Sequence, residues 1–160
     1  MNRRLPHPPT SCALARLLAV ALSLLAPAAA RATSCSMTMG TSIAFGAYDP
    51  LSPVPLTTTG MLQYRCSRGQ PIRITLSPGS SGDFQARTLR QGPWTLAYNL
   101  YADAGFGTVW GDGTGGTAAA PAVTTLANGL TVAYVFGRIR ERQEPPVGPY
   151  SDTIVVTFEF

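Results

Sequence analysis

The sequence predicts an all-β domain. Several short segments rich in β-branched and aromatic residues alternate apolar and polar side chains with a period of two. Gly, Pro, Asn and Asp, which favour turns, separate these segments. No window beyond residue 33 carries the 3.6-residue apolar period of an amphipathic helix. Short strands divided by turns, in the about 128 residues from 33 to 160, suit one β-sandwich.

The first extended region is expected to end at Ala44–Tyr48. A loop follows at 49–56, because its three prolines lack the N–H that a central strand needs. The remaining strands are expected, in chain order, at Gly60–Cys66, Ile72–Leu76, Trp94–Tyr101, Leu130–Ile139 and Asp152–Phe160. One face of the last strand carries four apolar side chains, Ile154, Val156, Phe158 and Phe160.

The first 32 residues have the three-part pattern of a secretory signal peptide. Arginines precede an apolar run at 17–30, and Ala30-Arg31-Ala32 offers a small-residue cleavage site. A transmembrane anchor is the alternative, but the run is shorter than the roughly 20 residues that a spanning helix needs. We therefore expect a signal peptide at 1–32, one exported domain at 33–160, and a destination in the periplasm and then at the cell surface.

The cysteine count agrees with export. Cys12 would leave with the signal peptide, so Cys35 and Cys66 remain as a pair that an oxidising compartment joins in a disulfide. Closing a loop of this length contributes roughly 3 to 4 kcal/mol in the chain-entropy model. A lipid-anchored Cys35 is the alternative, but the residues before it make a poor lipoprotein signal and Cys66 would lose its partner.

The charge of the exported domain argues against a nucleic-acid partner. Four of the 12 basic residues lie before residue 33 and all eight acidic residues lie after it, which leaves eight of each sign. Nucleic-acid binding needs a basic surface, and no cluster of arginines stands out in the sequence.

The residue types that are absent exclude most catalytic chemistry. The sole histidine, His7, lies in the signal peptide, and the chain has no lysine. This removes Ser-His-Asp and Cys-His nucleophile pairs, histidine-bound zinc and lysine Schiff bases. Asp103 and Asp112 could serve as a glycosidase pair, but both occupy glycine-rich contexts in which aspartate commonly forms turns. We expect no enzyme activity, no small-molecule substrate, no metal and no cofactor.

The glycine-rich segment 108–120 is expected to be a turn. A phosphate-binding loop needs Lys followed by Ser or Thr after its glycines, where this segment has alanines. A calcium loop needs several oxygen ligands, and Asp112 with Thr114 and Thr117 supplies few.

Four ordered stretches together resemble the spore coat protein U domain family. They are "CSMTMGTSIAFGAYDPLS" (35–52), "TLAYNLYADAGFGTVWGDGTGGT" (95–117), "YVFGRI" (134–139) and "GPYSDTIVVTFEF" (148–160). Members of this family are similar to subunits of archaic chaperone-usher pili. The resemblance implies an incomplete immunoglobulin-like β-sandwich that a donated strand completes. It also implies three partners, which are a periplasmic chaperone, an outer-membrane usher and a neighbouring subunit that lends the strand.

In the subunits that this chain resembles, the C-terminal strand borders the groove for the donated strand. Ile154, Val156, Phe158 and Phe160 are therefore the expected groove residues, with ordinary core packing as an equal alternative. A sandwich that lacks a strand exposes an apolar groove and an unpaired edge, and a lent strand satisfies both.

Two further expectations concern the position of the subunit. Cleavage after Ala32 leaves two residues ahead of Cys35, which span about 7 Å and are too short for a strand donor. A terminal, tip-like subunit that supports adhesion and biofilm formation is therefore expected, and a self-standing coat or cell-surface protein is the alternative. Apolar residues near predicted turns are the candidate adhesive residues, unless they fold back over the sandwich: Leu51, Val54, Leu56, Phe106 and Trp110.

Overall fold

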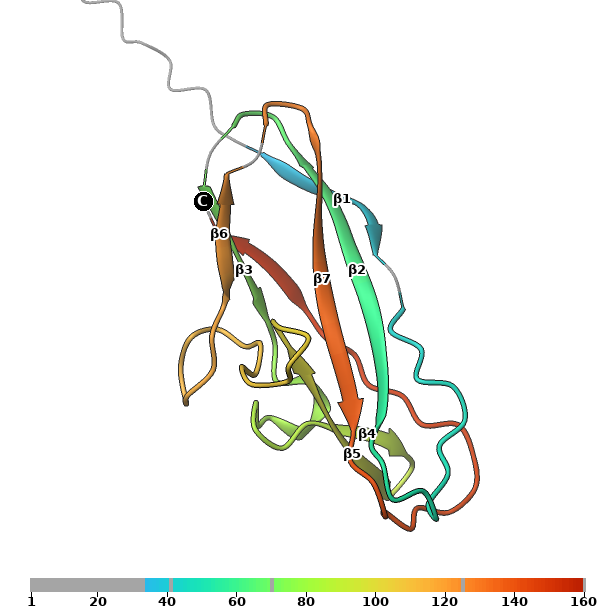
Figure 1. Cartoon of the computed structure of the whole chain (residues 1–160). Helices are drawn as coiled ribbons and strands as arrows, with labels where there is room; N and C mark the ends of the chain where they lie inside the picture. The colour runs from blue at the N-terminus through green and yellow to red at the C-terminus, as the bar shows by residue number, and fades with distance from the viewer. Residues whose placement is uncertain (1–33, 41, 70, 125, 160) are drawn as a thin grey trace, which may run out of the picture. The chain divides into compact units, whose positions relative to one another are not determined.

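The structure is a computed structural model that describes residues 34–40, 42–69, 71–124 and 126–159 (Figure 1). The predicted signal peptide at 1–32 and the predicted groove residue Phe160 lie outside the described residues.

The described residues form eight strands, one short 3-10 helix and long connecting loops. The elements in chain order are β1 (Cys35–Gly40), β2 (Leu56–Cys66), β3 (Pro71–Leu76), η1 (Gly79–Ser81), β4 (Thr88–Gln91), β5 (Trp94–Tyr101), β6 (Ala120–Thr124), β7 (Leu130–Ile139) and β8 (Val156–Glu159). The all-β prediction is confirmed. The C-terminal strand is shorter than predicted, and β2 begins four residues earlier, at the end of the proline-rich loop.

The strands pair antiparallel in two sheets. One sheet has the order β1-β2-β7-β5-β4, and the other has the order β6-β3-β8. Figure 1 shows the long strands β2 and β7 side by side, and their register runs from Leu56 opposite Ile139 to Arg65 opposite Leu130. The start of β2 and the end of β7 therefore lie at the same end of the sheet.

The core lies between the two sheets and follows the predicted alternation. Leu62, Tyr64 and Cys66 of β2 are buried, whereas Arg65 between them is exposed. Ile72, Ile74 and Leu76 of β3 are buried from the opposite sheet, and every second residue of β5 and β7 joins them. Because side chains of a strand alternate between its two faces, each of these strands presents one apolar face to the core.

Arg87 forms a buried polar centre that the sequence did not reveal. Its side chain is fully buried, just ahead of β4. Nη1 donates to Asn99 Oδ1 at 2.8 Å, and Nη2 donates to the Ser77 carbonyl at 2.7 Å and the Trp110 carbonyl at 2.8 Å. The acceptors come from the segment after β3, from β5 and from the glycine-rich loop, so one guanidinium joins three distant parts of the chain.

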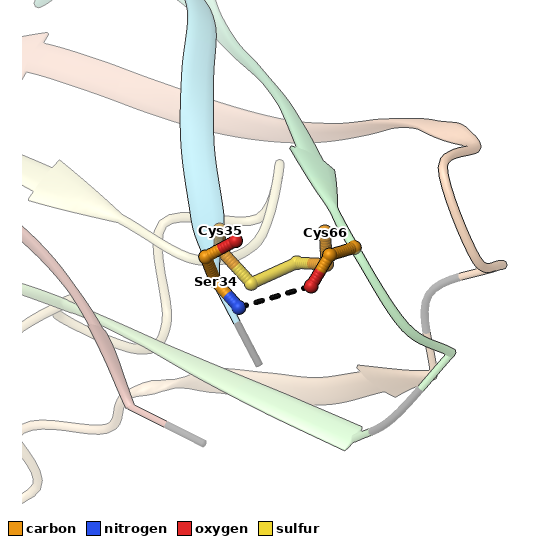
Figure 2. Close-up of a disulfide and its surroundings, with 4 residues drawn as sticks. Ser34, Cys35 and Cys66 are labelled. Atoms are coloured by element: carbon orange, nitrogen blue, oxygen red, sulfur yellow. Dashed lines mark hydrogen bonds between the residues drawn. A yellow bond between two sulfur atoms is a disulfide. The ribbon is translucent and has the colours of Figure 1, made fainter. Parts of the chain in front are cut away.

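The disulfide predicted between Cys35 and Cys66 is present and joins the start of β1 to the end of β2 (Figure 2). The two cysteines are direct partners in the strand register. Beside them, the Ser34 backbone N–H donates to Ser67 Oγ at 3.1 Å. The covalent bond thus holds β1, an edge strand, onto the five-stranded sheet.

Candidate functional site

An open groove of about 840 Å³ lies between the two sheets. Its floor consists of buried apolar side chains from both sheets, and its two rims are the segments 42–48 and 150–156. The apolar lining residues on which the following paragraphs depend are Ile43, Phe45, Leu76, Tyr98, Ile139, Ile154 and Val156. A groove of this volume lined mainly by apolar side chains is suited to bind an apolar partner.

The rim at 42–48 lies against the five-stranded sheet because two strand glycines give it room. A Cβ on Gly60 of β2 would come within 2.8 Å of Ile43 Cγ1, and a Cβ on Gly137 of β7 would come within 2.7 Å of Phe45 Cζ. A side chain at either glycine would therefore force the rim away from the sheet. The Thr58 hydroxyl also donates to the Ala44 carbonyl at 3.0 Å, which fixes the rim from the neighbouring strand.

The opposite rim ends in β8, which is an edge strand. In the described sheet β8 pairs with β3 alone, so its other side has no strand partner. The Ser77 N–H donates to the Val155 carbonyl at 2.9 Å, and the Val155 N–H donates to Ser77 Oγ at 2.9 Å. Both backbone groups of Val155 thus point toward the β3 side. Since these groups alternate along an extended chain, those of Ile154 and Val156 point toward the groove.

The Ser77 hydroxyl oxygen, and not the Ser77 carbonyl, accepts the hydrogen bond from Val155 because the carbonyl is already occupied. The Ser77 carbonyl oxygen accepts two hydrogen bonds from Arg87, at 3.2 Å from Nε and 2.7 Å from Nη2. The side-chain oxygen takes the place of that carbonyl as the acceptor for Val155. The buried arginine and the groove rim are therefore connected through one serine.

A tyrosine–aspartate pair forms a polar part of the groove wall. The Tyr98 hydroxyl donates to Asp152 Oδ2 at 2.8 Å, and Asp152 Oδ1 accepts from the Ser80 and Thr153 backbone N–H groups at 2.9 Å and 2.8 Å. Burial, followed by the hydrogen bond to Asp152, raises the pKa of Tyr98 above its usual value, so the phenol stays protonated. Phe45 packs edge-on against the same ring, with 5.9 Å between the centroids.

Tyr48, which lines the groove, forms a clamp with Gln143. The Gln143 N–H donates to the Tyr48 hydroxyl at 2.7 Å, and that hydroxyl donates to the Arg140 carbonyl at 3.0 Å. The Gln143 side chain also accepts from the Ala97 N–H at 2.7 Å and donates to the Ala97 carbonyl at 2.9 Å. The side-chain amide therefore pairs with β5 as a neighbouring backbone would, and ties the loop after β7 to the sheet.

The predicted groove residues divide into two sets. Ile154 and Val156 line the groove, whereas Phe158 lies beyond it and packs on Tyr64 of β2, with ring centroids 5.2 Å apart. Ile43, Phe45 and the floor residues were missed by the sequence reasoning. The alternation of Ile43 and Phe45 with small neighbours was a signal that could have identified this rim.

The predicted adhesive residues also divide. Leu51 and Val54 are exposed at 88% and 65%, whereas Leu56 packs against the core at the start of β2. Phe106 is half-buried and packs edge-on against Tyr101, with centroids 5.4 Å apart. The prediction that Trp110 is an adhesive residue is wrong. Its side chain is 1% exposed and its indole N–H donates to the Ile74 carbonyl at 2.9 Å, so it belongs to the core.

The glycine-rich loop is held by its own hydrogen bonds. Asp112 Oδ1 accepts from the Thr114 hydroxyl and N–H at 2.6 Å and 2.8 Å, and these bonds lower the pKa of Asp112. In the preceding turn, Asp103 accepts from the Gly107 and Thr108 N–H groups, which likewise lower the pKa of Asp103. Both carboxylates are thus engaged in turns, as the sequence predicted.

The described residues include neither a metal-ligand cluster nor a membrane-spanning helix. The part of the chain that the structure describes contains no group of three or more His, Cys, Asp or Glu side chains placed to hold a metal ion. Nor do the described residues include a helix long and apolar enough to cross a membrane.

The fold and the sequence both have known relatives. The structure is similar, with a TM-score of 0.55 and 21% identity, to a chain in the crystal structure of the CsuC-CsuE chaperone-tip adhesion subunit pre-assembly complex from archaic chaperone-usher Csu pili of Acinetobacter baumannii. The match covers 81% of this chain and 40% of that chain, so the chain spans less than half of its neighbour's length. At this identity the likeness shows a shared fold.

The sequence is 33% identical over 135 residues to Protein U of Myxococcus xanthus, across 76% of this chain and 73% of that protein. The family description "Spore Coat Protein U domain" matches residues 20–157. The chain belongs to the Spore Coat Protein U domain family.

Proposed function

We propose that the chain is a strand-accepting structural subunit of an archaic chaperone-usher pilus. One observation carries the proposal, which is the open apolar groove between the rims 42–48 and 150–156 beside the unpaired edge of β8. A donated strand would hydrogen-bond to that edge and insert alternate apolar side chains between the sheets. The likeness to a chain of the Csu complex supports this reading.

The physical need for a partner follows from the groove itself. Its partly exposed apolar residues Ile43, Ile154 and Val156 and its free backbone edge would both favour aggregation in a protein that remained alone. A periplasmic chaperone would cover them first, and a neighbouring subunit would replace the chaperone at an outer-membrane usher. The subunit would then reside at the cell surface, with a structural and not a catalytic role.

A matched pair of variants tests the groove. Ile154 lines the groove, and Val155 beside it is 60% exposed on the opposite face of the same segment. Ile154→Asp should reduce binding of a donor-strand peptide at least about 100-fold, because a carboxylate would be buried among apolar side chains. Val155→Asp should leave binding within about threefold.

The assay is thermal unfolding of the exported protein with and without donor-strand peptides from candidate neighbouring subunits. A peptide that raises the unfolding temperature of the unaltered protein and of Val155→Asp, but not of Ile154→Asp, supports strand acceptance. A sharp, high transition that no peptide changes would instead favour a second function, a self-standing coat protein. The family's name and the relative Protein U favour that second candidate.

We further propose that the subunit occupies a tip-like position and adheres through the loops at one end of the sheet. The start of β2 pairs with the end of β7, so the loops 49–55 and 140–150 leave the sheet at the same end (Figure 1). These loops expose Leu51, Val54 and Val147, of which the last is fully exposed. Exposed apolar side chains grouped on loops favour a binding role, here in attachment and biofilm formation.

Adhesion is tested by changing the exposed loop residues together. The double variant of Leu51 and Val54 to serine, which leaves the groove lining intact, should lower attachment of piliated cells to apolar surfaces at least about tenfold, by loss of apolar contact area. Pilus length and number serve as the control. Normal attachment by the variant would contradict the adhesive role. N-terminal sequencing tests the tip position, since a mature start well before Arg31 would provide a donor segment.

A further inference from the structure

A second, smaller cavity lies on the face of the five-stranded sheet that points away from the groove. Its volume is about 150 Å³. Tyr98 and Ile139 line the groove from the inner face of β5 and β7, so their strand neighbours Asn99 and Arg138 point to the outer face. Arg140, directly after the end of β7, also lines the cavity. Segment 85–87 and Val109 enclose the cavity from outside the strands.

The cavity is positively charged and has no acidic wall. Arg87, Arg138 and Arg140 line it, and none of its described lining residues is Asp or Glu. Arg87 is already hydrogen-bonded to three acceptor groups, so it contributes a fixed positive charge to the cavity lining. In the described part of the chain, neither Arg138 nor Arg140 forms an ion pair. Two of the three charges therefore remain available to a ligand.

Arg138 is held in place but incompletely bonded. Its guanidinium lies 5.8 Å from the centroid of the Phe106 ring, which fixes its orientation by a cation–π contact. Its Nε atom is buried and has no hydrogen-bond partner among the described residues. A buried donor without an acceptor is costly, so an acceptor that reaches this N–H would be favoured.

The spacing of the two arginines suits one small anion. Arg138 lies in β7 and Arg140 directly follows its end, so in extended chain their Cα atoms are about 7 Å apart, and both residues line the cavity. Guanidinium groups donate in a planar fork that matches carboxylate, sulfate and phosphate oxygens. The cavity volume of about 150 Å³ accommodates such a group.

We propose that this cavity binds a single oxyanion group between Arg138 and Arg140. The chemistry is common to carboxylates, sulfate and phosphate, and the ligand's remaining atoms would lie outside the cavity. The site does not depend on the proposed strand acceptance, because Arg138 and Arg140 line this cavity and not the groove.

The experiment measures binding of acetate, sulfate and inorganic phosphate to the exported protein by calorimetry, with chloride adjusted to hold the ionic strength constant. The arginine Nε–H signals are followed by NMR in the same titrations. We expect saturable binding of at least one of the three anions, accompanied by a shift of one Nε–H signal. Comparing the three anions identifies the preferred group.

Three variants assign the site. Arg138→Gln and Arg140→Gln should each weaken binding about tenfold or more, because each removes charge-assisted hydrogen bonds. Arg142→Gln removes the same charge from an exposed neighbour outside the cavity and should leave binding unchanged. Arg140 is exposed, so its variant remains informative if Arg138→Gln fails to fold. Non-saturable binding, or an equal loss in Arg142→Gln, would overturn the proposal.

Discussion

Removing the buried guanidinium of Arg87 should destabilise the domain more than any other single arginine change in the described residues. In Arg87→Ala, the Ser77 and Trp110 carbonyls and Asn99 Oδ1 each lose a charged donor. Losing a hydrogen bond from a charged group costs about 1.5 to 2 kcal/mol per acceptor, so the total is about 5 kcal/mol. For a domain of this size, that loss lowers the unfolding temperature by about 15 °C.

The assay is thermal and denaturant unfolding of the exported protein, with its disulfide intact and with a bound strand donor where one is needed for stability. Arg90→Ala is the matched control, because Arg90 is exposed and its side chain makes one long contact, at 3.5 Å to the Ser80 carbonyl. It should cost less than about 0.5 kcal/mol. Arg87→Lys keeps the charge but not the planar fork, and should lose about half as much stability as the alanine variant. If Arg87→Ala and Arg90→Ala were equally stable, the buried network would not support the core as described.

Two further perturbations test the groove. Gly137→Val should displace Phe45 and weaken donor-strand binding about tenfold or more. Gly82→Val is the control, because this loop glycine has open space around its Cβ position; its backbone would be strained, but binding should be unchanged. Equal binding losses in the two variants would show that the rim is not held by the Gly137 contact. The raised pKa of Tyr98 favours its neutral form in the fold, so its contribution to the unfolding free energy is constant below the ordinary value of 10.0 and falls as the pH rises above it. Tyr98→Phe should lower the free energy of unfolding by about 1 kcal/mol at neutral pH, and should reduce the fall of this free energy between pH 10 and 11. If the fall were unchanged, another group, such as the buried Tyr64, would dominate the alkaline pH dependence.

The parts of the fold that could be predicted from the sequence depend on local patterns. The alternation in β2 is regular because one face of this strand lies in the core, and a period of two records this directly. The other long strands depart from it, since Thr75 of β3 and Asn99 of β5 are also buried and β7 exposes Leu130, Val132 and Tyr134. β4 and β6 were missed. The first has four residues, and the second contains a proline and lies at a sheet edge, so neither carries a clear pattern.

The residues that were misplaced depend on contacts between distant segments. Trp110 is flanked by glycine-rich turns, which suggested a surface position, but its indole N–H reaches a carbonyl of β3. Arginine side chains are rarely fully buried, and the burial of Arg87 requires three acceptors that only the folded chain brings together. Phe158 shares a face with Ile154 and Val156, yet it meets the Tyr64 ring where the others meet the groove. A period of two assigns a side chain to one face of a strand, but it does not identify the residue that packs against that side chain.

The strand β7 serves both faces of the five-stranded sheet. Its inward residues Val135 and Ile139 line the groove, and Gly137 between them admits the Phe45 ring. The outward Arg138, together with Arg140 just beyond the end of the strand, lines the anion cavity. Because adjacent residues of a strand face opposite sides, changes at 138 and 140 leave the groove lining in place. A shift of one residue in the pairing of β7 would instead bring arginines into the apolar groove and remove both sites together. Both proposed functions therefore depend on the ten-residue register between β7 and β2.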